Sequence, residues 1–129
     1  MEACASECLF CRLRDSDELV SDLELVYCIR DKSPVTKGHL LIVTKRHVAS
    51  FFELTEDEVL QAYSLLNYMK SCLEKNDKTI SAFNVGINCG VSAGQTIMHA
   101  HIHLIPRRDG DISNPRGGVR GVIPSKRSY

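Results

Sequence analysis

Three histidines alternate with other residues in the segment TIMHAHIHLI, residues 96–105: His99, His101 and His103. In an extended strand, residues two apart point to the same face, so the three imidazoles would share one surface. The opposite face would carry Ala100, Ile102 and Leu104. A neutral imidazole can bind a metal such as zinc, or it can attack phosphorus as a nucleophile. The row of histidines therefore indicates a chemical site of one of these two kinds.

The segment directly before the histidines favours phosphorus chemistry. Residues 93–96, with the sequence AGQT, offer backbone N–H groups around a glycine, the carboxamide of Gln95 and the hydroxyl of Thr96. These groups are hydrogen-bond donors of the kind that hold an anion. A ligand with phosphate groups would fit between such a loop and the imidazoles.

Cys8 and Cys11, in the sequence CLFC, have the two-residue separation that lets both thiolates reach one tetrahedral zinc ion. The pair supplies only half of such a site. Two small, buried apolar side chains would also explain it, so both interpretations stay open on spacing alone. The other cysteines show no ligand spacing and are expected to be ordinary thiols: Cys4, Cys28, Cys72 and Cys89.

These residues need a scaffold, and the sequence predicts an α+β fold in which an antiparallel sheet carries one long helix. Apolar, β-branched runs predict strands at 23–29 and 39–44, paired as a hairpin. Thr55 and Glu58 form the pattern of a capping box before an apolar repeat of helical period, which predicts a helix over 55–75. We expect a further strand over 80–87, a loop over 88–95, and a last strand over 96–105 that ends at Pro106.

Composition predicts one globular domain over residues 1–129, with an irregular basic tail over 107–129. The 16 basic and 16 acidic residues cancel, so no overall charge favours a nucleic acid polymer or a membrane surface. No apolar run approaches the roughly 20 residues that span a bilayer, and the N-terminal residues do not resemble a signal peptide. We therefore expect a cytoplasmic protein whose partner is a small molecule.

Three segments together resemble the histidine triad (HIT) nucleotide-binding family. The sequence AGQT followed by HAHIHLIPR is similar to its signature, DKSPVTKGHLLIVTKRH to its strand and turn, and FNVGINCG to the strand before its phosphate loop. The resemblance covers residues 8–110 and implies a HIT-like fold and a homodimer. It also implies cleavage at the α-phosphate of adenine nucleotide conjugates, either dinucleoside polyphosphates or AMP phosphoramidates.

The resemblance assigns a role to each matching position. His101 would form a covalent nucleotidyl-imidazole intermediate, and His103 would contact the α-phosphate oxygens. Gln95 and Thr96 would hold the phosphates and assist the leaving group, next to a polar Asn88. Among nucleotide-binding residues, Asp31 would accept hydrogen bonds from the ribose hydroxyls, although a turn cap would also explain it.

The base would lie among apolar residues, which core packing would explain equally well: Leu9, Phe10, Ile29 and Leu41. His39 would support the histidines from behind the nucleotide site. In a subset of the family, the resemblance further implies that His47 and His99 join Cys8 and Cys11 around a structural zinc ion.

The leading hypothesis is therefore a hydrolase or transferase that releases a nucleoside monophosphate. A non-catalytic module that senses nucleotides and binds zinc is the first alternative, and a metalloenzyme that uses all three histidines as ligands is the second. The sequence leaves the leaving group open. Arg116 and Arg120 in the tail are candidates to reach the distal phosphates of a long polyphosphate.

Overall fold

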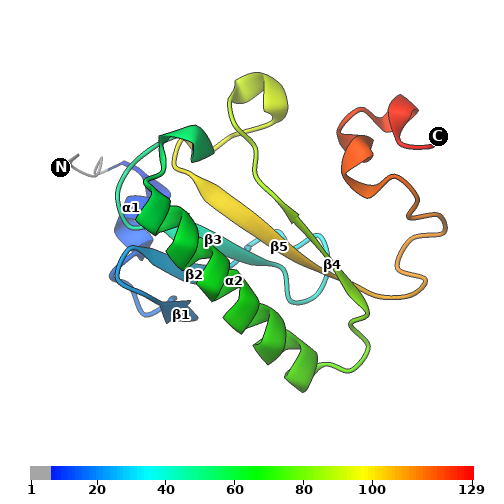
Figure 1. The fold of residues 1–129 in the computed structure, drawn as a ribbon, viewed down its shortest axis with the longest axis horizontal. Coiled ribbons are helices and arrows are strands. Elements are labelled where there is room, and N and C mark those ends of the chain that lie inside the picture. Colours follow the sequence, from blue (N-terminus) through cyan, green and yellow to red (C-terminus); the bar gives the residue numbers. More distant parts are fainter. Residues whose placement is uncertain (1–6) are drawn as a thin grey trace.

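The computed structural model describes residues 7–129, so Cys4 and the start of the predicted domain lie outside the described residues. Five antiparallel strands form one sheet in the order β1-β2-β3-β5-β4 (Figure 1). The elements in chain order are α1 (Leu9–Leu13), β1 (Ser21–Asp22), β2 (Val26–Arg30), β3 (Leu40–Thr44), α2 (Glu56–Asn76), β4 (Ala82–Gly86) and β5 (His101–Arg107). The predicted α+β class, with an antiparallel sheet and one long helix, is confirmed.

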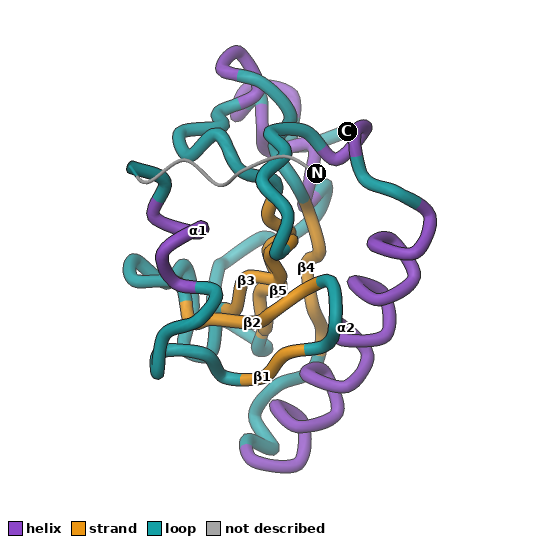
Figure 2. Tube along the Cα trace, turned by 90° about the vertical axis from the view of Figure 1, so that its left-hand side faces the viewer, coloured by secondary structure: helices purple, strands orange, loops and turns teal. Residues whose placement is uncertain are grey.

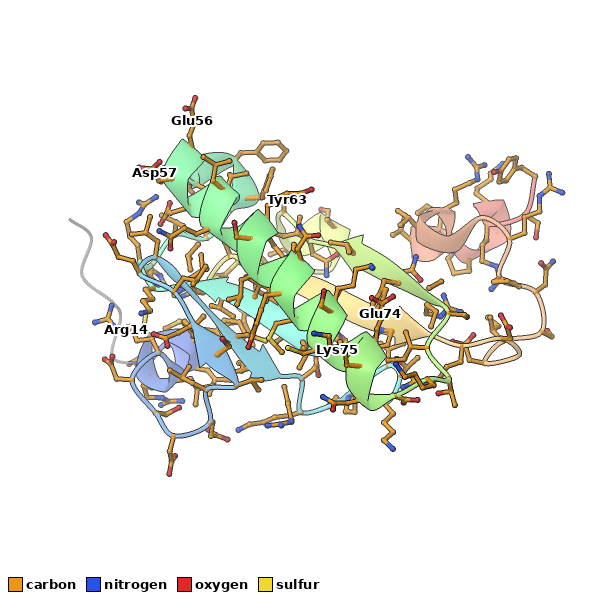
Figure 3. All side chains as sticks on the ribbon, turned by 60° about the horizontal axis from the view of Figure 1, so that its bottom comes forward. Arg14, Glu56, Asp57, Tyr63, Glu74 and Lys75 are labelled. Atoms are coloured by element: carbon orange, nitrogen blue, oxygen red, sulfur yellow. The ribbon has the colours of Figure 1, made fainter. Side chains whose placement is uncertain are left out.

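Helix α2 begins where the capping box predicts. The Thr55 hydroxyl accepts a hydrogen bond from the Glu58 backbone N–H, and the Glu58 carboxylate accepts one from the Thr55 backbone N–H. Glu56 and Asp57 project from this end of the helix (Figure 3), where negative charge complements the helix dipole. Ala62, Leu65 and Met69 turn inward against the sheet, while Tyr63 stays exposed. The helix therefore buries a single apolar stripe.

The sheet separates two apolar clusters, and Figure 2 shows it between α1 and α2. On the α2 side, strand residues that alternate along the chain pack against the helix: Val26, Cys28, Leu40, Ile42, Ile102 and Leu104. On the α1 side, Phe10 and Leu13 of the short helix pack with the intervening strand residues: Tyr27, Ile29, Leu41 and Val43. Because His101 and His103 pair with Val43 and Leu41, they belong to the α1 side. The prediction that the histidines face away from Ile102 and Leu104 holds for these two.

The last strand differs from the prediction at both ends. It begins at His101 rather than residue 96, because the Ala100 N–H donates to the Val48 carbonyl and the His99 N–H donates to the Ile97 carbonyl. His99 therefore lies in a bend before the strand. Pro106 does not end the strand, which continues to Arg107. Since β3 pairs with β5 only as far as Leu104, the missing N–H of Pro106 faces a side with no strand partner.

Two elements were not predicted at all. Helix α1 is a single short turn whose N-cap, Cys8, makes no side-chain capping bond, so it carries no local signal. Strand β1 has only two residues, Ser21 and Asp22, paired with β2. Both elements depend on contacts with distant parts of the chain.

After Arg107 the chain folds back beyond β4 (Figure 1), with 3₁₀ turns at Gly118–Val122 and Pro124–Lys126. The guanidinium groups of Arg116 and Arg120 stack on the Tyr129 ring, at 4.8 and 4.6 Å from its centroid. Within residues 7–129, no helix has the length and apolar character required to cross a membrane.

Candidate active site and metal centre

A cavity of about 590 Å³ opens on the α1 side of the sheet. Its walls come from α1, the C-terminal end of β2, the loop before β5, and β5 itself. Nine residues that the sequence singled out line it: Leu9, Phe10, Ile29, Asp31, Leu41, Asn88, Thr96, His101 and His103. An apolar part and a polar part thus share one cavity, as a nucleotide requires for its base and its phosphates.

His101 is held in one orientation by the backbone. Its Nδ1 lies 2.7 Å from the carbonyl oxygen of His99. A carbonyl can only accept, so Nδ1 carries the hydrogen, and in the neutral ring Nε2 keeps its lone pair. The Phe10 ring packs against the imidazole, with centroids 4.9 Å apart. The lone pair of His101 is therefore the one available to a ligand in the cavity.

His103 is oriented by a second histidine behind it. The Val35 backbone N–H donates to Nδ1 of His39 (3.0 Å), so the hydrogen of the neutral His39 ring is on Nε2. That Nε2 lies 2.9 Å from Nδ1 of His103 and 3.5 Å from Oδ2 of Asp31. His103 therefore accepts at Nδ1 and keeps its own N–H at Nε2, as a donor for the cavity.

Burial keeps this pair of histidines neutral. It lowers the pKa of His39, against the opposing effect of Asp31. Burial, followed by the nearby His101 and His39, lowers the pKa of His103. Both rings are therefore uncharged near neutral pH. The hydrogen bonds from Val35 to His39 and from His39 to His103 require this state, because each ring accepts at Nδ1.

Asp31 follows β2 and lies at the cavity wall. One of its carboxylate oxygens, Oδ1, accepts a hydrogen bond from the Ser33 backbone N–H (2.7 Å). This is the bond of a turn cap, and it coexists with a place in the cavity. The two interpretations of Asp31 are therefore compatible.

Two predicted site residues do not line the cavity. Gln95 is buried, and its carboxamide bonds to the backbone: Oε1 accepts from the Gly90 N–H, and Nε2 donates to the carbonyl oxygens of Ala49 and Ile97. Through these bonds it braces the loop that precedes β5. His39 also lies behind the cavity, where it contacts His103 and not the space for a ligand.

Several residues of the cavity wall were not predicted from the sequence: Leu13, Glu18, Arg30, Lys32, Ser33 and Ile97. Leu13 would have been found if α1 had been recognised, because it lies one helical turn from Leu9 and Phe10. Lys32 and Ser33 directly follow Asp31. Glu18 carries no signal in its local sequence.

A second cluster lies at the other end of the histidine row. One donor atom from each of Cys8, Cys11, His47 and His99 lies within 4.8 Å of all the others. Nδ1 of His99 is 3.3 Å from Sγ of Cys8, 3.6 Å from Sγ of Cys11 and 3.2 Å from Nδ1 of His47. Sγ of Cys11 is 3.2 Å from Nδ1 of His47. These separations are close to the roughly 3.3–3.8 Å between donors around a tetrahedral zinc ion, so the cluster can hold a metal.

His99 is prepared for this role by its hydrogen bond. Its Nε2 donates to the Thr44 carbonyl oxygen (2.7 Å), which leaves the lone pair on Nδ1 toward the cysteines. The ring is fully buried, and burial lowers the pKa of His99 to about 4. Since His99 joins the cysteines while His101 belongs to no ligand cluster among residues 7–129, the geometry disfavours a metal bound by all three histidines.

Comparison with known proteins assigns most of the chain to one family. The HIT domain model matches residues 13–110. An uncharacterized HIT-like protein of Saccharolobus solfataricus is 32% identical over 124 residues, which are 92% of this chain and 84% of the relative. The asymmetrical bis(5′-nucleosyl)-tetraphosphatase of Schizosaccharomyces pombe is 38% identical over 62% of this chain and 43% of its own. The adenylylsulfatase HINT3 of Arabidopsis thaliana is 33% identical over 82% of this chain and 55% of its own.

Solved structures agree with this assignment. A HIT family protein from Bacillus anthracis superposes with a TM-score of 0.75 and 33% identity, over 83% of this chain and 77% of its own. A zinc-bound histidine triad family protein from Mycobacterium smegmatis has a TM-score of 0.75 and 27% identity, over 84% and 80% of the two chains.

Proposed function

The chain belongs to the HIT domain family, and from this membership we propose that it is an enzyme that cleaves nucleotide conjugates at the α-phosphate. The observation that carries the proposal is the hydrogen bond from Nδ1 of His101 to the His99 carbonyl, which leaves the Nε2 lone pair to the cavity. Two of its relatives are named for cleaving a dinucleoside tetraphosphate and an adenylyl sulfate. The bonds in both substrates join an α-phosphate to a good leaving group.

In the first step, Nε2 of His101 attacks the α-phosphorus. A phosphorus–nitrogen bond forms as the bond from phosphorus to the leaving group breaks, and the leaving group departs with the bonding electrons. A polyphosphate leaves as an anion, whereas an amine takes up a proton from water as it departs. The ring becomes cationic at that moment. The His99 carbonyl stabilises this charge because it already accepts the hydrogen on Nδ1.

His103 supports the same step without reacting. Its Nε2–H is a donor for a non-bridging α-phosphate oxygen, where negative charge must be held during the displacement. His39 and Asp31 keep this donor in the required tautomer through the 2.9 Å contact between the two rings. The loop of Asn88, Gly94 and Thr96 lines the phosphate end of the cavity, and Gln95 holds that loop in place.

In the second step, water attacks the phosphorus of the nucleotidyl-histidine. The phosphorus–nitrogen bond breaks with its electrons returning to Nε2, a nucleoside monophosphate leaves, and the attacking water loses one proton to solvent. The His101 ring is thereby restored to its neutral state. We propose adenine as the base and either a polyphosphate or an amine as the leaving group. The apolar part of the cavity, lined by Leu9, Phe10, Ile29 and Leu41, suits the apolar faces of a purine.

We further propose that the cluster of Cys8, Cys11, His47 and His99 binds a structural zinc ion. Its two thiolates and two imidazoles are the donor set of a closed zinc site, with separations that fit one ion. Elemental analysis of the purified protein should find about one zinc per chain. A Cys8→Ser, Cys11→Ser double variant should bind none, and an unchanged metal content would contradict the site.

We also propose that the protein is a cytoplasmic homodimer, and the family resemblance supports the dimer. Within the described chain, β4 is an edge strand, and Val85 on it is half exposed. An unpaired edge is a natural place for a second copy to add its own strand. The mass measured by light scattering after size-exclusion chromatography should be that of two chains.

A substrate panel tests the activity. The zinc-loaded protein should release AMP from diadenosine tetraphosphate or from adenosine 5′-phosphoramidate, and calorimetry should show that it also binds AMP. Binding of AMP without turnover of any donor would favour a non-catalytic sensor. Failure to bind AMP would contradict the assignment of the cavity itself.

A further inference from the structure

The short helix α1 belongs to the metal cluster and to the nucleotide cavity at once. Cys8 and Cys11 direct their sulfur atoms to His99 and His47, at 3.3 and 3.2 Å. Between them in the chain, Leu9 and Phe10 line the cavity. The two outer residues of this four-residue segment thus belong to the metal cluster, and the two inner residues belong to the cavity.

Phe10 makes the connection through side-chain contacts. Its ring meets the His99 ring edge-on, with centroids 5.8 Å apart, and meets the His101 ring at 4.9 Å. Phe10 is only 1% exposed, and its carbonyl oxygen accepts a hydrogen bond from the Tyr27 hydroxyl. The ring therefore cannot move without disturbing a metal ligand on one side or the proposed nucleophile on the other.

Helix α1 has little stability of its own. It has five residues, and its N-cap makes no side-chain capping bond. Isolated helices of this length are not stable in water, so its order must come from what it packs against and from what its cysteines hold. A metal ion that ties both cysteines to His47 and His99 would therefore also fix the cavity wall.

We infer that Phe10 is a positioning residue that couples metal binding to nucleotide binding, so that each ligand raises the affinity of the other. The inference rests on the proposed function for the identity of the nucleotide. Coupling of this kind is reciprocal: if the metal raises the nucleotide affinity by some factor, the nucleotide raises the metal affinity by the same factor.

Zinc affinity measured with and without AMP tests this coupling. In a competition titration against a chromogenic chelator, saturating AMP should tighten zinc binding by about tenfold, within the range usual for coupled sites. Phe10→Leu should reduce the effect to less than about twofold while zinc still binds. The matched control is Phe52→Leu, because Phe52 is 83% exposed and lies in neither site. It should keep the full effect.

A spectroscopic arm uses only metal-loaded protein, so it remains informative if the metal-free chain unfolds. With cobalt(II) in place of zinc, AMP should shift the visible ligand-field bands of the wild type and of Phe52→Leu, but not those of Phe10→Leu. If the wild type binds AMP but its bands and its zinc affinity do not change on AMP binding, the inference is overturned and the proposed function is not. Retention of the full effect in Phe10→Leu would overturn it as well. Failure of the wild type to bind AMP would contradict the inference together with the proposed function.

Discussion

The first two histidines of the row, His99 and His101, differ in the ring nitrogen that faces away from the backbone. His99 donates from Nε2 to the Thr44 carbonyl and presents Nδ1 to two cysteines. His101 donates from Nδ1 to the His99 carbonyl and presents Nε2 to the cavity. Identical side chains two residues apart are thereby prepared for metal binding and for attack on phosphorus.

This difference shows that spacing alone does not set the role of a histidine. The backbone changes direction between these residues, because His99 lies in a bend and His101 begins β5. Because of this change, the His99 ring points into the buried metal cluster, and the His101 ring points toward a cavity that a ligand can enter. Substitutions at His101 and in the metal cluster should therefore have separate effects. The first should affect catalysis, and the second should affect metal binding and stability.

The largest expected effect is on catalysis at the cavity end. His101→Ala removes the nucleophile, so the rate of AMP release from diadenosine tetraphosphate should fall by about 10⁴-fold or more. The zinc content should stay at the wild-type value, because among residues 7–129 His101 supplies no ligand atom to the cluster and its ring bonds only to the backbone carbonyl of His99. Steady-state kinetics and elemental analysis on the same preparation check both. A rate within tenfold of the wild type would remove His101 from the mechanism.

In the metal cluster, Cys11→Ser should have its main effect on the stability of the fold. Loss of one thiolate should abolish tight zinc binding and lower the free energy of unfolding by at least about 3 kcal/mol, because a structural metal binds only the folded chain. Urea titrations measure the change, and wild type in excess chelator should be destabilised similarly. Cys89→Ser is the matched control, because Cys89 lies outside the cluster. Equal stability of Cys11→Ser and Cys89→Ser would show that the cluster holds no structural metal.

The sequence predicts those features that depend on residues close together in the chain, and it does not predict those that depend on distant contacts. Local signals predicted α2, because Thr55 and Glu58 cap it, and they predicted the strand face of His101 and His103. Spacing predicted the cysteine pair. The bend at His99 depends on the Ala100–Val48 hydrogen bond, and α1 depends on contacts with β2 and the cluster. Such contacts join segments far apart in the chain, so no local pattern reveals them.

Gln95 illustrates the same limit within the candidate site. Its position in AGQT, directly before the histidines, suggested a contact with phosphate. In the fold its carboxamide bonds to the backbone of Gly90, Ala49 and Ile97. These bonds depend on the tertiary structure, and the sequence AGQT gives no sign of them.

Substitutions at His39 should have a smaller effect on catalysis than His101→Ala, because His39 acts through His103. His39→Leu removes the donor to His103, so kcat should fall by about 10- to 100-fold, while zinc content is unchanged. His39→Gln offers an amide that can accept from Val35 and donate to His103, and should recover most of the rate. Equal losses in both variants would indicate that His39 serves only packing.

The smallest expected effect is on the pH dependence of stability. Burial lowers the pKa of His39 and of His103 below the 6.5 of a free histidine, so below that pH the unfolded chain binds protons that the folded chain does not. The free energy of unfolding should therefore fall as the pH is lowered from 7 toward 5. In His39→Gln the slope should be shallower, as urea titrations at several pH values would show. Because both proteins keep the metal cluster, its own protonation cancels in the difference, and identical slopes would contradict the prediction.

Trapping the reaction intermediate tests the division of the histidine row most directly. Zinc-loaded protein is mixed with adenosine 5′-phosphoramidate, quenched in base to preserve a phosphorus–nitrogen bond, digested and sequenced by mass spectrometry. We expect one AMP group on His101 and none on His99 or His103. An AMP group on either of those residues, or rapid turnover with no nucleotidyl-histidine at any time point, would contradict it.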